Sequence, residues 1–407
     1  MGAANVQPTR RVVLGGSAAA AIGGVFAGFG AGRATAAENG GAEPKATDAA
    51  HNPRFQPFHG KYQAGILTEP QAHAEFLGFN MHLDGLDRSE RIERIRSILK
   101  MLTADAQRLM SGRGVLADTE PEMSHAATDL TVTVGIGQSI LEVLGHDSAV
   151  LGKLPAFAGE KLDARYGQSD LLIQCCAQDP TVLHHAVRAL RKNLRGITEP
   201  AFAQSGFMHA AHPLRQGQGF RNLFGQLDGI NNPTGEAREL AVFGDAQEPS
   251  WIAGGTTLVL RRIEMNLDKW DEVDRAGRDF ALGRRQSDGS PLSGTKPTDP
   301  VDLQAVDGMG LPAVAAHAHV ARAKPETADE VLWRRGYNYH ETQSSGLLFA
   351  SYQRDPRRSF VPVQRRLAQV DALNEWITHV GSALYAILPG VAEGKYLGEG
   401  LFSQIEQ

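Results

Sequence analysis

Cysteine is nearly absent from this sequence of 407 residues, and its two examples, Cys175 and Cys176, are adjacent within the apolar run 171–177. Neighbouring residues on a strand point to opposite faces of the sheet, so these two thiols are not expected to pair with each other. They also lack the spacing of metal ligands. We therefore interpret both cysteines as buried core residues, the usual place of free cysteine.

The sequence also has no block of basic residues. Its 41 lysines and arginines stand against 46 aspartates and glutamates, a formal net charge of −5. This mildly acidic balance argues against nucleic-acid binding as the main task. With 42% hydrophobic and 21% charged residues, the composition is that of an ordinary globular protein. The length predicts two or three domains.

The first 36 residues have the pattern of a processed segment rather than of a folded domain. Arg10 and Arg11 precede a weakly apolar stretch rich in glycine and alanine, and 34–36 offers a small-x-small cleavage site. This pattern resembles a twin-arginine export signal. The alternative is a membrane anchor, which the many glycines of 12–32 make a weak apolar span. We expect a periplasmic or extracellular protein with no stable membrane span after removal of the signal, and a flexible leader over 37–52.

The first half of the remaining chain alternates strand and helix patterns. A helix beginning at Asp87 has a capping-box glutamate at Glu90, and a second helix has Asp179 as its cap and Pro180 at its first position. Strands are predicted at 73–82, 130–134 and 171–177, and helices over 87–112 and 179–196. This order fits an α+β, ferredoxin-like unit. His184 and His185 diverge on their helix, so we interpret them as surface or packing residues.

The second half begins with a strand and a short helix, which a long polar segment follows. Strands are predicted at 256–264 and 346–352, with a short helix from Leu267, a loop over 274–310 and a last helix over 360–377. Asp371 would lie on the apolar face of that last helix. A carboxylate on a buried face needs a partner.

The stretch 219–235, GFRNLFGQLDGINNPTG, combines four glycines with one carboxylate among apolar neighbours, Asp228. Taken alone, Asp228-Gly229 is a common turn pair. The same aspartate could also be a tuned acid or base. The residues themselves leave both interpretations open.

Together with motifs downstream, the GQLDG segment at 225–229 resembles the signature of the dye-decolourising peroxidases, a family of haem enzymes. The resemblance spans about residues 55–395. It implies an α+β fold of two ferredoxin-like units with antiparallel sheets, over 53–218 and 219–407, and a haem pocket in the C-terminal unit. It also implies one haem b per chain, hydrogen peroxide as oxidant and small-molecule reductants.

The segment 317–325, HAHVARAKP, resembles the family's iron-ligand motif. By its distance to Pro325, His319 matches the ligand of the haem iron, and a neutral imidazole is the usual axial ligand for such chemistry. Ala321 and Lys324 depart from the family's arginine and asparagine, and Arg322 stands one position late. His317 would face the same side if the segment were a strand, and is the fallback ligand.

The remaining roles also come from the resemblance. Arg334, in the segment 333–339, matches the arginine on the opposite side of the haem, where Asp228 would move the proton of peroxide. Asp371 would accept a hydrogen bond from the iron ligand, the alternative being a salt bridge to Arg366. Because aspartate titrates in the acidic range, we expect the best activity toward acidic pH. Further haem contacts are expected from Gly229, Ile230, Asn231, Lys324, Pro325, Glu326 and Phe349, with Leu348 as the alternative to Phe349.

Two other functions stay open on the sequence alone. One is a haem-handling, deferrochelatase-like protein of iron acquisition, and the other is an exported binding domain without a cofactor. Homo-oligomer formation is equally open. Electron relay to bulky dyes and simple core packing are competing roles for five aromatic residues, Trp333, Tyr337, Tyr339, Trp376 and Tyr385.

Overall fold

The computed structural model describes residues 55–125, 129–147, 151–209, 219–243, 252–403 and 405. The predicted export signal at 1–36, the leader at 37–52 and the unit boundary between 218 and 219 lie outside the described residues. No helix in the described part of the chain is long and apolar enough to cross a membrane.

The first four strands form an antiparallel sheet in the order β4-β1-β3-β2. They are β1 (His73–Met81), β2 (Thr131–Ile136), β3 (Leu171–Ala177) and β4 (Thr198–Phe207). Between them lie α1 (Arg88–Met110), α2 (Gln138–Leu144), α3 (Pro180–Leu194) and the 3-10 turns η1 (Pro121–Ser124) and η3 (Ala164–Tyr166). This connectivity and order are those of the predicted ferredoxin-like unit. Sequence analysis had not predicted β4.

The last four strands repeat the arrangement in the order β6-β7-β5-β8. They are β5 (Thr256–Met265), β6 (Trp333–His340), β7 (Ser345–Gln353) and β8 (Ile377–Ile387). The helices of this part are α5 (Gly235–Phe243), α6 (Leu267–Asp271), α7 (Arg275–Leu282), α8 (His319–Ala323) and α9 (Phe360–Val370), with the 3-10 turns η4 (Ala328–Glu330), η5 (Ala372–Glu375) and η6 (Glu399–Leu401). The α+β prediction with two ferredoxin-like units is therefore confirmed.

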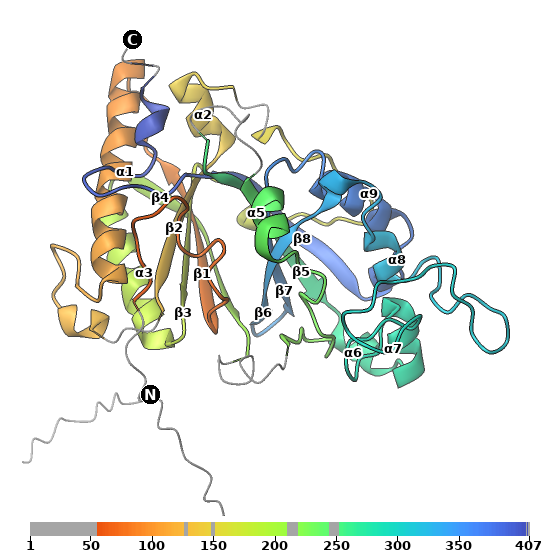
Figure 1. Ribbon diagram of the computed structural model, residues 1–407. Coiled ribbons are helices and arrows are strands. Elements are labelled where there is room, and N and C mark those ends of the chain that lie inside the picture. Colours follow the sequence, from red (N-terminus) through yellow and green to blue (C-terminus); the bar gives the residue numbers. More distant parts are fainter. Residues whose placement is uncertain are drawn as a thin grey trace, which may run out of the picture. The chain divides into compact units, whose positions relative to one another are not determined.

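Few hydrogen-bonded pairs join the two sheets. Gly135 and Ile136 of β2 pair with Ile387 and Ala386 of β8, and Phe207 of β4 pairs with Asn338 of β6. Through these contacts the eight strands close into one continuous sheet. In Figure 1, α1 and α3 lie together on one side of the strands, and α8 and α9 lie on the other.

Two apolar cores follow from the alternation of side chains along the strands. One lies between the first sheet and α1, α2 and α3 and continues to β5, β8 and α9. The other includes the inward side chains of the closed sheet and extends to α5, α6 and α7. Cys175 belongs to the first core and Cys176 to the second, and both thiols are free. The prediction that the cysteines are buried and unpaired is confirmed.

Three local predictions were wrong. The stretch 274–310 is not all loop, because α7 is capped by Asp274, whose side chain accepts the amide of Gly277. The last helix does not reach residue 377, since α9 ends at Val370 and β8 begins at Ile377. His319 is not on a strand but at the start of α8, so the argument that His317 shares its face fails.

Candidate active site

Asp228 lies in a glycine-framed turn that fixes its backbone and leaves its carboxylate partly open. Gly225 and Gly229 have φ values of +77° and +79°, a left-handed conformation that favours glycine. The amide of Asp228 donates to the carbonyl of Phe220 at 2.8 Å. Its carboxylate accepts the amide of Gly229 at 2.6 Å. The turn therefore holds the side chain in one direction without burying it.

Arg334 reaches the same carboxylate from β6. Its Nη1 atom lies 3.9 Å from Oδ1 of Asp228. Asn232 holds it there, because the Asn232 side chain donates to the carbonyl of Arg334 at 2.8 Å and accepts from its amide at 3.2 Å and from its Nε at 3.1 Å. This role of Asn232 is not visible in the sequence, since Asn232-Pro233 is also an ordinary turn pair.

Gly336, two residues after Arg334 on β6, lies beside Asp228. A Cβ atom there would lie 3.3 Å from Leu347, 3.5 Å from Phe220 and 3.7 Å from Oδ2 of Asp228. Gly336 pairs with Phe349 of β7, so Phe349 faces the same side as Arg334. Leu348, the alternative, is buried inside the closed sheet. Phe349 is thus the residue that can line a pocket on this face.

His319 and Asp371 form the second part of the site. Nδ1 of His319 lies 2.6 Å from Oδ2 of Asp371, and the other carboxylate oxygen accepts the amide of Leu373 at 3.0 Å. Asp371 reaches the ring from the end of α9 and not from a helix face as predicted. Its predicted alternative partner, Arg366, instead pairs with Glu330 at 2.6 Å.

The imidazole ring of His319 is partly exposed, whereas the carboxylate of Asp371 that bonds to it is buried. The side chain of His319 is 30% exposed, and that of Asp371 is 1% exposed. Because Nδ1 is engaged with Asp371, Nε2 is the nitrogen left to face the open space. This is the arrangement by which an acid orients a metal-ligating histidine and raises its basicity.

The charges around His319 connect the two parts of the site. Burial alone lowers the pKa of His319, but the charge of Asp371 and its hydrogen bond outweigh burial, and the pKa is raised above its usual value. Arg334 lowers the same pKa and Asp228 raises it. The charges of both side chains therefore act on the imidazole, while a single haem pocket lined by Asp228, His319 and Arg334 stays a prediction.

The residues around this space fit a haem group. Nε of Arg322, one helical turn after His319, is buried without a hydrogen-bond partner in the described part of the chain. Arg284 is buried, and both burial and the charge of Arg334 lower its pKa. Its guanidinium donates hydrogen bonds to neutral groups: the carbonyls of Gly289 and Pro297, and the side chain of Asn231. This surplus of positive charge suits the two carboxylates of haem b.

The other residues predicted to contact haem differ in the groups that their side chains bond to. Asn231 accepts from Arg284 at 3.1 Å, which keeps it beside the site. Lys324 donates to the carbonyl of Val301 at 3.1 Å, and Glu326 lies 3.5 Å from Arg366. Because those two side chains are engaged elsewhere, their contact with haem stays a prediction. So does that of Gly229, Ile230 and Pro325.

His317 is separated from the iron-ligand position. Its ring lies edge-on to Phe280, with 5.5 Å between the ring centroids. Four of the five aromatic residues considered as electron relays, Trp333, Tyr337, Tyr339 and Tyr385, are buried. Trp376 is partly exposed, and its ring lies edge-on to Trp270 at 5.1 Å. Among the five candidates, only Trp376 combines exposure with an aromatic neighbour.

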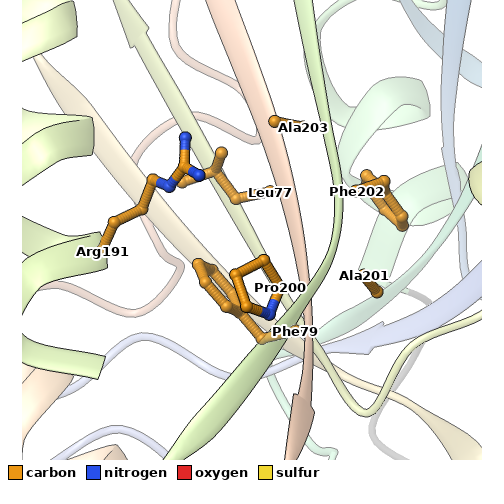
Figure 2. A pocket seen from close by; sticks show the side chains of 7 residues that line it. All are labelled: Leu77, Phe79, Arg191, Pro200, Ala201, Phe202 and Ala203. Carbon is orange, nitrogen blue, oxygen red and sulfur yellow. The ribbon is translucent and has the colours of Figure 1, made fainter. Parts of the chain in front are cut away.

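A separate small hollow lies on the first sheet, at β1, β4 and α3. Figure 2 shows Arg191 beside it, over the side chains of Leu77 and Phe79. Its volume of about 120 Å³ is below the roughly 300–1,000 Å³ of ordinary ligand pockets. This hollow is therefore too small to be an alternative haem site.

Comparison with known proteins agrees with this geometry. Residues 63–208 match the Dyp-type peroxidase N-terminal domain, and residues 220–392 match the C-terminal domain. A dye-decolorizing peroxidase of Thermobifida fusca is 34% identical and covers 97% of both chains. The chain belongs to the Dyp-type peroxidase family.

Further relatives in this family include solved structures. A DyP-type peroxidase from Cellulomonas bogoriensis superposes with a TM-score of 0.82, at 39% identity over 86% of this chain and 99% of the other. Ferric DtpA from Streptomyces lividans gives 0.79, at 34% identity over 87% and 98%. A deferrochelatase of Escherichia coli O157:H7 is 30% identical over 85% of this chain and 87% of its own length. Membership in the family makes this protein a haem-dependent peroxidase.

Proposed function

We propose that this Dyp-type peroxidase oxidises dyes, phenolic compounds and similar reductants, with Asp228 and Arg334 on one side of the haem and His319 as iron ligand. The haem, when bound, supplies the redox chemistry that reduces peroxide to water and accepts electrons from the reductant. The observation that carries the assignment is the geometry of two pairs: Nδ1 of His319 lies 2.6 Å from Oδ2 of Asp371, and Nη1 of Arg334 lies 3.9 Å from Oδ1 of Asp228.

Asp228 moves the proton in this proposal. Cleavage of the O–O bond of hydrogen peroxide requires one proton to move from one oxygen to the other, which then leaves as water. The carboxylate of Asp228 accepts that proton and returns it. Arg334 supplies a fixed positive charge where negative charge develops on the departing oxygen. Asn232 holds the guanidinium in place through its contacts with the amide and Nε of Arg334.

His319 and Asp371 would hold the iron. Asp371 accepts the hydrogen bond of Nδ1 and so keeps Nε2 unprotonated, as a ligand of the haem iron would need to be. The test is the absorbance spectrum of protein expressed with sufficient haem, followed by dye oxidation with and without peroxide. A Soret band with peroxide-dependent oxidation supports the assignment, and the absence of a Soret band contradicts it.

Release of iron from haem is a second candidate role, because the Escherichia coli relative is a deferrochelatase. The same pocket would hold the haem while the metal leaves. Incubation with haem under reducing conditions separates the two roles by their products. Recovery of metal-free porphyrin favours iron release, and its absence beside rapid dye oxidation favours the peroxidase.

We further propose export by the twin-arginine route to the periplasm or the outside of the cell. The support is the paired Arg10-Arg11 ahead of a weakly apolar segment and a small-residue cleavage site at 34–36. Substitution of both arginines by lysine should retain the protein in the cytoplasm with its signal uncut. Unchanged export of that variant would contradict the route.

A further inference from the structure

A hollow of about 580 Å³ lies between α7 and the end of α9, and we call it the α7–α9 hollow. Its volume is within the roughly 300–1,000 Å³ of pockets that hold small molecules. The described residues that line it include none of Asp228, His319 and Arg334. It is therefore a second concave site, separate from the residues predicted to meet iron and peroxide.

The walls of the α7–α9 hollow are apolar and largely aromatic, and they are open to solvent. Phe280 of α7 is 48% exposed, and Val370 at the end of α9 is 52% exposed. The ring of His317 lies edge-on to Phe280, with 5.5 Å between the ring centroids. Trp376 also lines the hollow and is partly exposed. Aromatic side chains in a concave surface offer faces on which a flat ring system can stack.

The lining of the hollow carries negative charge. It includes Asp371 and Glu375 but no lysine or arginine. Because Asp371 is buried and bonded to His319, Glu375 is the lining acid that can meet a ligand directly. Three more acids adjoin the lining residue Val273 along the chain: Asp271, Glu272 and Asp274.

The arginines of the flanking helices do not offset this charge. The range 271–279 has four acids against two arginines. Arg278 donates to the carboxylate of Asp271 at 3.2 Å, and Arg275 donates to the side chain of Gln286 at 3.1 Å. The two arginines of α9 are not among the residues that line the hollow. A negative, aromatic site favours a cation, which both the acids and the ring faces attract.

We propose that the α7–α9 hollow binds planar aromatic cations and holds reductants of that class for oxidation, an inference that rests on the proposed function. The ring system lies against Phe280 and Trp376, and the cationic group faces Glu375. Asp371 lines the hollow and accepts the hydrogen bond of His319. A reductant bound there is consequently next to the carboxylate that holds the predicted iron ligand.

The oxidation balances with hydrogen peroxide as the only oxidant. Two molecules of a cationic aromatic amine each lose one electron and one N–H proton. One molecule of hydrogen peroxide takes up both electrons and both protons, its O–O bond breaks, and two molecules of water result. The electrons pass by way of the haem, so the amine need not enter the space where peroxide reacts.

Binding of azure B, a flat three-ring cation with an N–H group, tests the site without peroxide. Equilibrium dialysis with the haem-loaded protein should show binding that weakens as salt is added. The flat anion 1-aminoanthraquinone-2-sulfonate should bind more weakly. Glu375→Lys should weaken binding of azure B about tenfold, because a repulsion replaces an attraction of similar size, and should strengthen binding of the anion.

Glu199→Lys is the matched control. Glu199 is exposed on β4 and does not line the hollow, so this variant has the same change of net charge with the site intact. It should leave the binding of both dyes unchanged. Phe280→Ala probes the aromatic wall and should weaken azure B binding roughly threefold through loss of a ring face. Equal melting temperatures and Soret bands of the variants would verify their folding.

Steady-state oxidation separates this inference from the proposed function. Glu375→Lys should raise KM for azure B about tenfold at an unchanged kcat, and it should not raise KM for the anionic dye. Equal binding of cation and anion would overturn the site, as would equal effects of Glu375→Lys and Glu199→Lys. Selective loss of azure B binding with an unchanged KM would overturn the role of the hollow in oxidation. If haem-loaded protein oxidised neither dye, the proposed function would fail, while dialysis would still decide whether the hollow binds the cation.

Discussion

The two ferredoxin-like halves share their strand order, but in the described residues they differ in the helices that cover their sheets. In the first half, α1 runs for 23 residues against the sheet, and every residue of β2 and β3 is buried. In the corresponding crossover of the second half, α6, α7 and α8 have five, eight and five residues. Arg334 and Gly336 of β6 are consequently left partly exposed. The site arises where a long packed helix is replaced by short ones.

Each half also contains a buried aspartate bound to a histidine, and the difference between the pairs is the exposure of the imidazole. In the first half Nε2 of His185 lies 2.9 Å from Asp118, and both side chains are buried. In the second half the ring of His319 is partly exposed, while the carboxylate of Asp371 is buried. A similar pair is therefore enclosed in the fold of one half and leaves a partly exposed imidazole in the other.

The largest effect is expected from His319→Ala. Removing the imidazole takes away the iron ligand, so the variant should lose the Soret band of bound haem and all peroxide-dependent oxidation. His317→Ala is the matched control, because that ring packs on Phe280. Absorbance after haem reconstitution measures both. Equal loss of the Soret band in His319→Ala and His317→Ala would contradict the assignment of His319, rather than His317, as the iron ligand.

Asp228→Asn should come next. The amide cannot accept the proton of peroxide, so we expect turnover to fall roughly 10²–10⁴-fold while haem binding persists. Asn232→Ala should lower turnover less, because it loosens Arg334 without removing a proton carrier. Stopped-flow reaction of the haem-loaded variants with peroxide measures the step. An unchanged rate in Asp228→Asn would exclude this aspartate as proton carrier.

Asp371→Asn should have a smaller effect than loss of the ligand itself. Partners that orient a metal-binding histidine typically contribute roughly 10–100-fold in affinity or activity. The variant should bind haem more weakly and show a shifted reduction potential. Haem transfer to an acceptor protein measures the strength of haem binding, and redox titration measures the reduction potential. A variant with unchanged values for both would mean that Asp371 only caps the η5 turn.

The smallest effect on function is expected from Asp118→Asn in the first half. This change should lower stability by about 1–3 kcal/mol, because it weakens the hydrogen bonds of a buried carboxylate, and it should leave haem binding intact. Burial raises the pKa of Asp118, but the hydrogen bonds from the Glu120 amide and His185 outweigh it, so the pKa lies below its usual value.

The pH dependence of the stability lost in Asp118→Asn follows from the direction in which folding shifts the pKa of Asp118. A carboxyl whose pKa is lowered by folding stabilises the protein above its unfolded pKa of about 3.9, and this contribution is lost as the pH falls through the folded value. The stability difference between the unchanged protein and Asp118→Asn should therefore be full at neutral pH and shrink below about pH 4. Urea unfolding at several pH values measures it. A difference that grows toward acid would contradict the argument.

Much of the fold could be predicted because local patterns determine it. The capping box at Asp87 and Glu90 is present at the start of α1, and the buried run 171–177 is β3. The short elements could not be predicted in the same way. The eight residues of α7 include two arginines and an aspartate, so the sequence shows no clear apolar face, although the folded protein buries Ala281 and Leu282. Likewise, nothing local shows that the chain turns at Asp371 before β8.

The site could be predicted only through residues whose motifs are distinctive. Asp228, His319 and Arg334 carried recognisable neighbours, and the structure places Nη1 of Arg334 3.9 Å from Oδ1 of Asp228. Asn232 and Arg284 act through contacts with residues 102 and 53 positions away along the chain. Such partners depend on how distant segments meet, and their residue types are common elsewhere in the sequence, so no sequence pattern distinguishes them.

The most direct test of the account is a crystal structure of the haem-loaded protein. The account predicts Nε2 of His319 bound to the iron, with Asp228 and Arg334 together on the opposite face of the porphyrin. Iron bound by any other side chain, or Asp228 and Arg334 lying on the His319 side, would contradict it.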